Sequence, residues 1–408
     1  MLTGRSWWAS LGSPRCVAAP MVAQSELAFR LLARRYGAEL CYTPMLLAKL
    51  YAAVPEYRAD HFSTCAADRP LVAQLAGHDP DTMVRAALLL QPHVDAIDIN
   101  LGCPQGIARK GKYGAYLLPD VERVCQIVRA LCAAIDLPIT CKVRLLPSLG
   151  ATVDACRRFE DAGVSALTVH GRTREQNKQF VGSADWTAIA TVTRALTVPV
   201  IANGGIATAA DVDACLRETG AAAVMSSEAL LGNPALFAAN RDPATGAHVT
   251  QRRLAREYLQ LAREVGAPDA SARAHVFKLL HGALCARPQL RDRLAEAYGL
   301  DQFEGILDAL DELDPTLLLE PMAHTAEGER AERRVLQWYL RHQCRDEARA
   351  LLADGRPPAG GEGERTARRV RRAQHKAVLR ERHAARVVKL ANAAASDGQS
   401  RVRDGAAA

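Results

Sequence analysis

A cysteine stands at the end of a buried-strand pattern in the segment AIDINLGCPQGIARKGKYGAYLL, residues 96–118. Apolar residues alternate up to Leu101, and glycine, Cys103 and proline then end the strand. A thiol has an ordinary pKa of about 8.5, so it is mostly protonated at neutral pH and can act as a general acid. The nearby sequence lacks the histidine and asparagine partners of a cysteine hydrolase. Cys103 therefore suits acid catalysis better than nucleophilic attack, and a buried turn residue is the alternative.

Further polar side chains end similar short apolar runs elsewhere in the chain. They are Gln74, Asn100, Lys142, His170 and Asn203, with Arg144 and Arg172 beside them. Each has a structural explanation on its own, because a histidine at a strand end is often a satisfied core residue. If the fold gathers these side chains, they lack partners there unless a ligand binds.

Eight short apolar runs alternate with stretches of helical period. The runs are residues 16–21, 40–45, 70–77, 96–103, 139–145, 166–171, 199–205 and 222–227. Between them, stretches such as 120–135 place their apolar residues on one helical face. Eight strand-helix units predict an α/β fold, a (βα)8 TIM barrel over residues 16–240, whereas a doubly wound sheet normally has fewer strands. The strand ends of a barrel meet at one mouth, so we expect the polar side chains to converge there.

The loops after the last two predicted strands narrow the choice of ligand. The glycines of NGG at 203–205 let backbone amides approach a ligand, and SSEALLGNP at 226–234 offers amides at a helix start. Such a pair of loops is the usual phosphate site of a TIM barrel. Lys142 would lie across the mouth, where its charge can stabilise a reduced flavin ring. The pattern therefore indicates a barrel that binds FMN.

Cysteine usage and composition exclude several classes of protein. The chain has 11 cysteines and no CxxC pair, which fits a reducing compartment better than a disulfide scaffold, a zinc site or an iron–sulfur site. No apolar run approaches the roughly 20 residues that cross a bilayer. We expect a cytoplasmic protein with no metal and no membrane contact, and a short N-terminal tail over residues 1–15.

The chain becomes helical throughout after the barrel. Residues 250–354 predict a small all-helical domain that either caps the barrel or docks a nucleic acid. Its basic residues for docking are Lys278, Arg333, Arg334 and Arg341.

Residues 355–408 predict a flexible linker and a basic, disordered C-terminal tail. GRPPAGGEGE at 355–364 breaks the helical period with proline and glycine. Residues 365–389 carry ten Lys or Arg and one Glu, a local charge of +9 in a chain whose net charge is +7. We expect this tail to fold on RNA, with a nuclear-import signal as the alternative.

Several motifs resemble those of the tRNA-dihydrouridine synthases. They are APMV at 19–22, YGAELCYTPML at 36–46, DINLGCPQGIARKGKYGAYLL at 98–118, CKVR at 141–144, LTVHGRTREQ at 167–176 and NGGI at 203–206. The resemblance covers residues 16–240 and extends more weakly to about 345. It is closest to the branch that acts on D-loop uridines at tRNA positions 16 and 17.

This resemblance implies a role for each candidate site residue. FMN contacts fall to Pro20, Met21, Val22, Gln74, Lys142, His170, Asn203, Gly204, Gly205, Ser227 and Glu228. Cys103 becomes the acid that protonates uracil C5, and Asn100 helps to place the uracil. RNA phosphate contacts fall to Arg109, Lys110, Lys112, Arg172 and Arg174. Other branches carry Gly-Arg where this chain has Ser227-Glu228, so backbone amides must hold the phosphate and the Glu228 carboxylate must point away.

The expected function is FMN-dependent reduction of tRNA uridine by a monomer, with NADPH or NADH as reductant. One alternative is an FMN barrel that reduces a free pyrimidine, in the manner of dihydroorotate dehydrogenase. The other is a non-catalytic RNA-binding module. The helical domain and the basic tail disfavour the first alternative, and the combination of Cys103, Lys142 and His170 disfavours the second.

Overall fold

The computed structural model describes residues 3–177 and 182–313 of the 408-residue chain. The expected linker and basic tail lie outside the described residues, as do Arg333, Arg334 and Arg341. In the described part of the chain, no helix is long and apolar enough to cross a membrane.

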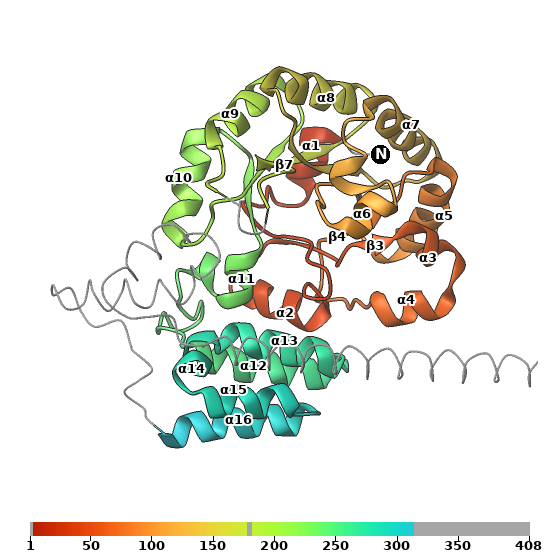
Figure 1. Cartoon of the computed structure of the whole chain (residues 1–408). Coiled ribbons are helices and arrows are strands. Elements are labelled where there is room, and N and C mark those ends of the chain that lie inside the picture. Colours follow the sequence, from red (N-terminus) through yellow and green to blue (C-terminus); the bar gives the residue numbers. More distant parts are fainter. Residues whose placement is uncertain (1–2, 178–181, 314–408) are drawn as a thin grey trace, which may run out of the picture. The chain divides into compact units, whose positions relative to one another are not determined.

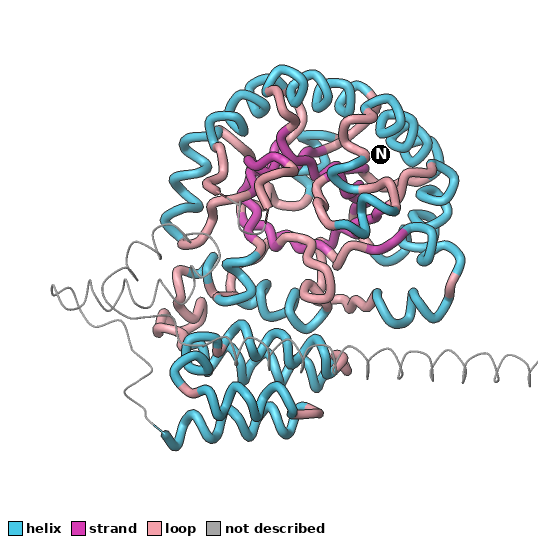
Figure 2. The backbone as a smooth tube through the Cα atoms, in the orientation of Figure 1, coloured by secondary structure: helices cyan, strands magenta, loops and turns pink. Residues whose placement is uncertain are grey.

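Parallel strands close into a barrel, which confirms the predicted TIM-barrel fold (Figure 2). The strands of the ring are β1 (Cys16–Ala18), β2 (Leu40–Tyr42), β4 (Leu71–Ala76), β5 (Ala96–Leu101), β6 (Ile139–Leu145), β7 (Ala166–Thr173), β8 (Val200–Asn203) and β9 (Ala223–Ser226). Each pairs with the next, and β9 pairs with β1 to complete the ring. The short strand β3 (Leu46–Leu47) adds to the end of β4.

Prolines shorten two strands relative to their apolar runs. The run at 40–45 is a strand only as far as Tyr42, before Pro44, and the run at 16–21 leaves the sheet before Pro20. Proline has no N–H to donate to a strand ladder. The freed ends place Met21 and Met45 at the barrel mouth.

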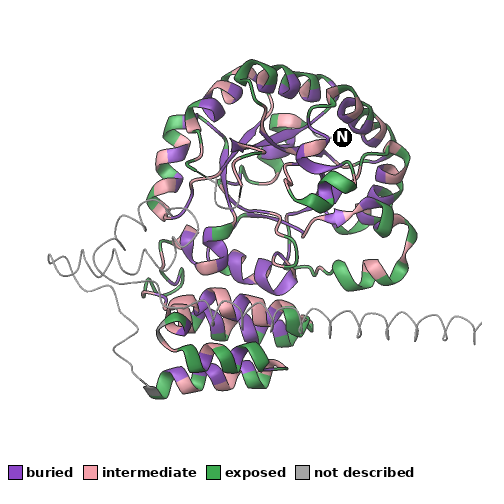
Figure 3. Cartoon of the chain, in the orientation of Figure 1, coloured by how far each residue is buried: buried purple, intermediate pink, exposed green. Residues whose placement is uncertain are grey.

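Amphipathic helices surround the barrel (Figure 1). The outer helices are α2 (Leu27–Arg35), α5 (Pro80–Leu90), α7 (Val121–Ala134), α8 (Leu149–Asp161), α9 (Trp186–Ala195) and α10 (Ala209–Thr219). Helix α7 matches the amphipathic stretch at 120–135 and begins where the Asp120 carboxylate accepts a hydrogen bond from the Arg123 amide at 3.2 Å. The outer helices are buried on the side facing the sheet and exposed on the other (Figure 3).

Short elements occupy the loops between the strands and the outer helices. They are α3 (Ala48–Ala53), α4 (Pro55–His61), α6 (Gly106–Lys110), α11 (Glu228–Gly232) and the 3-10 turns Gln91–His93, Gly114–Tyr116 and Leu236–Ala238.

The N-terminal segment differs from the expected tail because it forms helix α1 (Gly4–Ser10). Trp7 and Trp8 are 4% and 5% exposed and pack with the side chains that fill the barrel interior. Interior residues of this cluster such as Leu40, Ala96 and Ala166 are the first residues of their strands. Helix α1 therefore closes the end of the barrel away from the mouth.

A series of helices follows the barrel. They are α12 (Gln251–Val265), α13 (Asp269–Leu279), α14 (His281–Ala286), α15 (Pro288–Glu296) and α16 (Leu300–Leu313). Of these, α12 and α13 contact α2. At this interface, the Tyr258 hydroxyl donates to Glu26 Oε1 at 2.8 Å and His275 Nε2 lies 3.0 Å from Glu26 Oε2. The His275 ring also stacks on Phe29, with 4.8 Å between ring centroids. The helical segment is therefore anchored to the barrel by a shared carboxylate and apolar packing.

A buried ion pair ties α2 to the loop before β4. The Arg30 and Asp68 side chains are 1% and 0% exposed, and Arg30 Nη2 donates to Asp68 Oδ2 at 2.6 Å. Arg34 donates to the other carboxylate oxygen at 3.2 Å. Arg30 also donates to the Ser25 and Ser63 carbonyls at 2.6 and 2.7 Å. Because every group is paired, the charges offset their desolvation cost.

Replacing Asp68 by alanine should lower the free energy of unfolding by about 3–5 kcal/mol, because Arg30 becomes a buried charge without a counterion. Asp213, which pairs with Arg15 at 62% and 63% side-chain exposure, provides the matched control. Asp213→Ala should cost less than about 1 kcal/mol. Urea unfolding followed by circular dichroism measures both values, and equal costs would contradict this assignment.

Candidate active site

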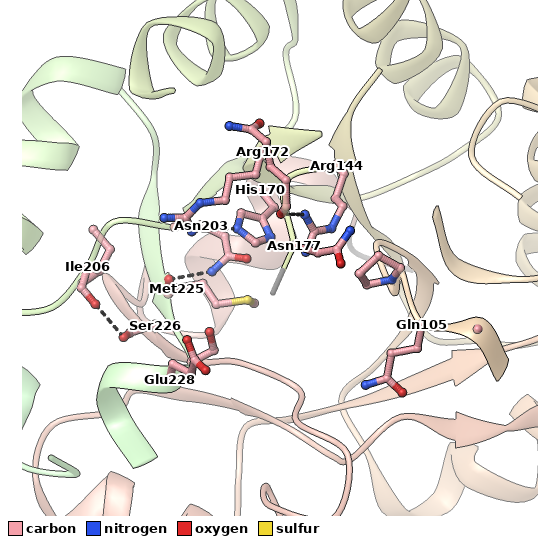
Figure 4. A pocket seen from close by; sticks show the side chains of 15 residues that line it. Gln105, Arg144, His170, Arg172, Asn177, Asn203, Ile206, Met225, Ser226 and Glu228 are labelled. Carbon is pink, nitrogen blue, oxygen red and sulfur yellow. Dashed lines mark hydrogen bonds between the residues drawn. The ribbon is translucent and has the colours of Figure 1, made fainter. Parts of the chain in front are cut away.

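Two adjoining cavities open at the C-terminal ends of the strands. The Cys103 cavity encloses about 350 Å³ and is lined by Pro20, Met21, Val22, Met45, Gln74, Asn100, Cys103, Lys142 and Lys278, among others. The Gly204 cavity encloses about 630 Å³ and is lined by Arg172, Gly204, Ile206 and Ser226, among others. Both cavities share Gln105, Arg144, His170, Asn203, Ser227 and Glu228. Figure 4 shows the Gly204 cavity, with Gln105 across the view from Ser226 and Glu228.

A chain of hydrogen bonds runs from the barrel interior to Cys103. Asp98 Oδ2 accepts from Gln74 Nε2 at 2.8 Å, and Gln74 Oε1 accepts from Asn100 Nδ2 at 2.7 Å. Asn100 Oδ1 then accepts from the amides of Gly102 and Cys103 at 3.1 and 3.0 Å. Each hydrogen bond in this series fixes whether the next side-chain amide turns its oxygen or its NH2 group toward Cys103.

The first member of the chain, Asp98, is fully buried between β4 and β6. Its second oxygen accepts from the Thr140 hydroxyl at 2.7 Å. Burial raises the pKa of Asp98 to about 6, while the bonds from Gln74 and Thr140 favour the charged form. At pH 7 and above the carboxylate is therefore an acceptor at both oxygens, which requires Gln74 to present its NH2 group to Asp98.

Close packing holds the Cys103 turn from two other sides. Arg144 Nε donates to the Gly102 carbonyl at 2.7 Å, and the Ala115 amide donates to the Cys103 carbonyl at 3.1 Å. Gly114 has φ +65°, and a Cβ there would lie 2.6 Å from the Cys103 carbonyl oxygen. Only glycine fits this position, so the segment carrying α6 packs directly on the turn. The Cys103 thiol is partly exposed at the cavity.

Lys142 lies in the wall between the two cavities. Its ammonium donates to Asn203 Oδ1 at 2.7 Å, and Asn203 Nδ2 donates to the Met225 carbonyl at 2.9 Å. Burial and the neighbouring Arg144 charge lower the pKa of Lys142 to about 8. The lysine is therefore mostly charged at pH 7 and mostly neutral at pH 9.

His170 is held as a neutral ring by the cations around it. Burial and the charges of Lys142, Arg144 and Arg172 keep the pKa of His170 well below its ordinary value. Arg172 Nη1 lies 3.2 Å from His170 Nε2, and a guanidinium can only donate. His170 Nε2 is therefore the acceptor, and the ring proton is on Nδ1.

The glycine turn after β8 provides a cradle at the Gly204 cavity. Gly204 and Gly205 have φ +104° and +79°. A Cβ on Gly204 would lie 2.9 Å from the Ala184 Cβ, and a Cβ on Gly205 would lie 3.1 Å from Trp186 Nε1. Trp186 donates to the Gly204 carbonyl at 2.9 Å and so fixes the turn. The exposed backbone beside Arg172 suits a phosphate, so these residues fit FMN.

Arg172 and Glu228 are two charged residues of the mouth. Arg172 is 5% exposed, donates twice to the Gly182 carbonyl at 3.1 and 2.9 Å and lines the Gly204 cavity, and its contact with RNA stays a prediction. Burial lowers the pKa of Arg172, and the Glu228 charge partly offsets this effect. Glu228 itself lines both cavities.

The other residues expected to contact RNA lie outside both cavities. Arg109 is exposed on α6, and Lys110 and Lys112 line a separate pocket. The Arg174 guanidinium lies 5.1 Å from the centroid of the Tyr116 ring and pairs with Glu175 at 2.9 Å. These residues surround the mouth without entering it.

Asp98 and Gln105 join the site although they were not among the expected residues. They are joined by Arg144, expected at the mouth, and Lys278, expected in nucleic-acid docking. Two of them carry a sequence signal, because Asp98 is two residues before Asn100 and Arg144 is two residues after Lys142. Residues two apart on a strand share a face. Lys278 lies on α13 and offers no such signal. In the described residues no group of three or more His, Cys, Asp or Glu is placed to hold a metal ion.

Matches to known proteins agree with the family that the motifs resemble. Residues 17–308 match the family model described as Dihydrouridine synthase (Dus). The chain is 43% identical over 332 residues to a tRNA-dihydrouridine(16/17) synthase-like protein of Rattus norvegicus, across 81% of this chain and 73% of that protein. It is 38% identical over 312 residues to the tRNA-dihydrouridine(16/17) synthase of Schizosaccharomyces pombe, across 74% of this chain and 78% of that protein. The corresponding protein of Saccharomyces cerevisiae is 40% identical over 304 residues, across 72% of each chain.

The affinity of the apoprotein for FMN should fall as pH rises from 7 to 9. A lysine with a pKa of about 8 loses its charge over this range, and the dissociation constant should rise about tenfold. Lys142→Arg keeps a positive charge throughout, so its affinity should vary much less. Fluorescence titration with FMN at each pH measures both proteins, and parallel pH profiles would contradict the assignment.

Removing the carboxylate at Asp98 should slow the step that uses Cys103, because Gln74 and Asn100 lose their fixed orientation. We expect the single-turnover rate at which tRNA oxidises the reduced flavin to be at least about tenfold lower in Asp98→Ala. A misplacement of about 1 Å can lower a reaction rate by up to about 100-fold. Asp98→Asn should recover most of the rate, because its amide oxygen can accept from Gln74 while its NH2 group donates to Thr140. A wild-type rate in Asp98→Ala would contradict the orienting role.

Proposed function

The chain belongs to the dihydrouridine synthase family, and we propose that it reduces uridines 16 and 17 of tRNA to 5,6-dihydrouridine. FMN is the cofactor and NADPH or NADH the reductant. The observation that carries the proposal is a thiol fixed at a cavity that Lys142 also lines, beside a second cavity with a glycine cradle. Reduction of uracil adds a hydride to C6 and a proton to C5, and bound flavin that NADPH or NADH has reduced would supply the hydride.

Cations and backbone of the mouth hold the cofactor. Lys142 and neutral His170 provide donors for the flavin ring, because their hydrogen atoms on Nζ and Nδ1 remain available after the contacts described above. Arg172 and the amides at Gly204 and Ser227 suit the phosphate. Arg172 also balances Glu228, which explains how a carboxylate can stand at an anion site.

Cys103 is the group that gives the C5 proton. Asn100 holds the Cys103 amide and Arg144 holds the Gly102 carbonyl before it, so the Cys103 backbone has a fixed position at the cavity. Asn100 uses its oxygen on the turn and one amide hydrogen on Gln74, which leaves its second amide hydrogen for a uracil oxygen. The same residue therefore positions the acid and can orient the base.

A uridine within folded tRNA reaches this cavity only when it is extruded from its stack. Lys278 from α13 lines the Cys103 cavity, so the helical segment reaches the mouth. Arg109 and the Arg174–Tyr116 pair offer positive charge and an aromatic surface around it. These features favour a macromolecular substrate over a free pyrimidine.

Three further parts of the proposal concern the cellular form of the protein. We propose that residues 365–389, with their local charge of +9, add sequence-independent contacts to RNA phosphates. We also propose that the protein acts as a monomer. We place the protein in the cytoplasm, where reduced cysteines persist.

Cys103→Ala should lose most dihydrouridine formation while its fold and its flavin content stay unchanged. General-acid catalysis contributes about 100- to 10,000-fold, so oxidation of the reduced flavin by tRNA should slow by about that factor. Reduction of the flavin by NADPH precedes the uridine chemistry and should keep its wild-type rate. Rapid-mixing absorbance separates the two half-reactions.

Cys65→Ala is the matched control, because Cys65 is an exposed cysteine that lies outside both cavities. It should behave as wild type in both half-reactions. If tRNA also oxidises the reduced flavin of Cys103→Ala at the wild-type rate, the C5 proton comes from another group.

A further inference from the structure

A third cavity opens on the rim of the barrel beyond the Cys103 turn. This rim pocket encloses about 490 Å³, within the range of ligand sites. Leu47, Lys49, Leu50, Lys110, Lys112 and Tyr113 line it, together with the loop from Gly77 to Asp79. It therefore combines strand β3 and helix α3 on one side with the end of α6 on the other.

Tyr113 separates the rim pocket from the active site. Its side chain lines the pocket and belongs to the same small apolar cluster as Cys103. A Cβ on Gly111 would lie 2.5 Å from the Tyr113 ring, so the glycine allows the ring to lie against the chain. One aromatic side chain thus stands between the rim pocket and the proposed acid.

The rim pocket is positively charged over an apolar surface. It has three lysines, Lys49, Lys110 and Lys112, against one carboxylate, Asp79, for a balance of 3 − 1 = +2. Among the described residues none of these lysines forms an ion pair, whereas Asp79 accepts from the amide and the hydroxyl of Thr82 at 3.0 and 2.5 Å. Leu50 is 38% exposed and gives the surface on which an unstacked base can lie.

The backbone at Lys112 holds an unfavourable conformation. Its φ is +53°, in the left-handed region that favours glycine or asparagine. The Gly111 carbonyl next to it lies 3.1 Å from His78 Nδ1, which ties this turn to the loop after β4. A lysine kept in a strained turn at the edge of a cavity is typical of a binding position.

We propose that the rim pocket binds the tRNA nucleotide adjacent to the uridine in the Cys103 cavity. The proposal rests on the proposed function, in which two consecutive uridines are substrates. When one of them is extruded into the mouth, its neighbour also loses its stack and needs an apolar surface with cations for its phosphate. The rim pocket supplies both, and the Tyr113 ring lies between this pocket and the reacting base.

The test pairs a change in the protein with a change in the RNA. Wild type and Leu50→Gln each act on tRNA that carries a normal or an abasic residue beside the target uridine. Loss of the neighbouring base should lower kcat/KM of wild type about tenfold, the scale of one base-stacking contact. The kcat/KM of Leu50→Gln should already be lower than that of wild type with normal tRNA, and it should fall little further with abasic tRNA. Leu88→Gln changes an exposed leucine of α5 and is the matched control.

A charge reversal at Lys49 checks the phosphate contact. Lys49→Glu should raise KM for tRNA and reduce its salt dependence, whereas Arg194→Glu, an equal change on exposed α9, should do so much less. Flavin reduction by NADPH without tRNA should match wild type in both variants. A Lys49→Glu effect confined to NADPH would assign the pocket to the reductant and overturn the proposal.

Failure of this inference is distinct from failure of the proposed function. If wild type makes no dihydrouridine in normal tRNA, the proposed function is wrong. If wild type makes dihydrouridine, and the abasic residue lowers kcat/KM of Leu50→Gln as much as it lowers kcat/KM of wild type, only the role of the rim pocket is wrong.

Discussion

An ionised carboxylate inside the barrel determines how the proposed acid is presented. Asp98 accepts hydrogen bonds at both oxygens, so Gln74 must turn its NH2 group toward Asp98. The Gln74 oxygen then faces Asn100, which must turn its own NH2 group toward Gln74. The raised pKa of Asp98 reflects the cost of burying its charge, and the fully bonded chain offsets that cost. A residue deep in the barrel thereby places the Cys103 turn at the cavity without touching a ligand.

Positive charge is the second constraint on the mouth. Lys142, Arg144 and Arg172 are gathered around His170, and burial lowers the pKa of all three cations, with Arg144 adding to the effect at Lys142. Such a cluster is costly unless an anion binds among its members. A phosphate and the negative charge of a reduced flavin both meet this need. The same cluster of cations therefore suits both the binding of the cofactor and the proposed redox chemistry.

Local patterns in the sequence predict the barrel and most of its mouth, because strand ends in a closed barrel must converge. A closer use of the two-residue strand period would also have found Asp98, two residues before Asn100. Arg172 was different, because its side chain turns back to the Gly182 carbonyl and His170 through contacts that the local pattern does not encode. Helix α1 was missed for a similar reason, since Trp7 and Trp8 gain their apolar partners only when the barrel closes.

A double-mutant cycle between Asp98 and Cys103 tests most directly whether the buried carboxylate acts through the thiol. The measurement is the single-turnover rate at which tRNA oxidises the reduced flavin in folded, flavin-loaded wild type, Asp98→Ala, Cys103→Ala and the double variant. If Asp98 only orients the acid, the double variant should react as slowly as Cys103→Ala and no slower. Full additivity of the two losses would show that Asp98 acts independently of Cys103 and would contradict this mechanism.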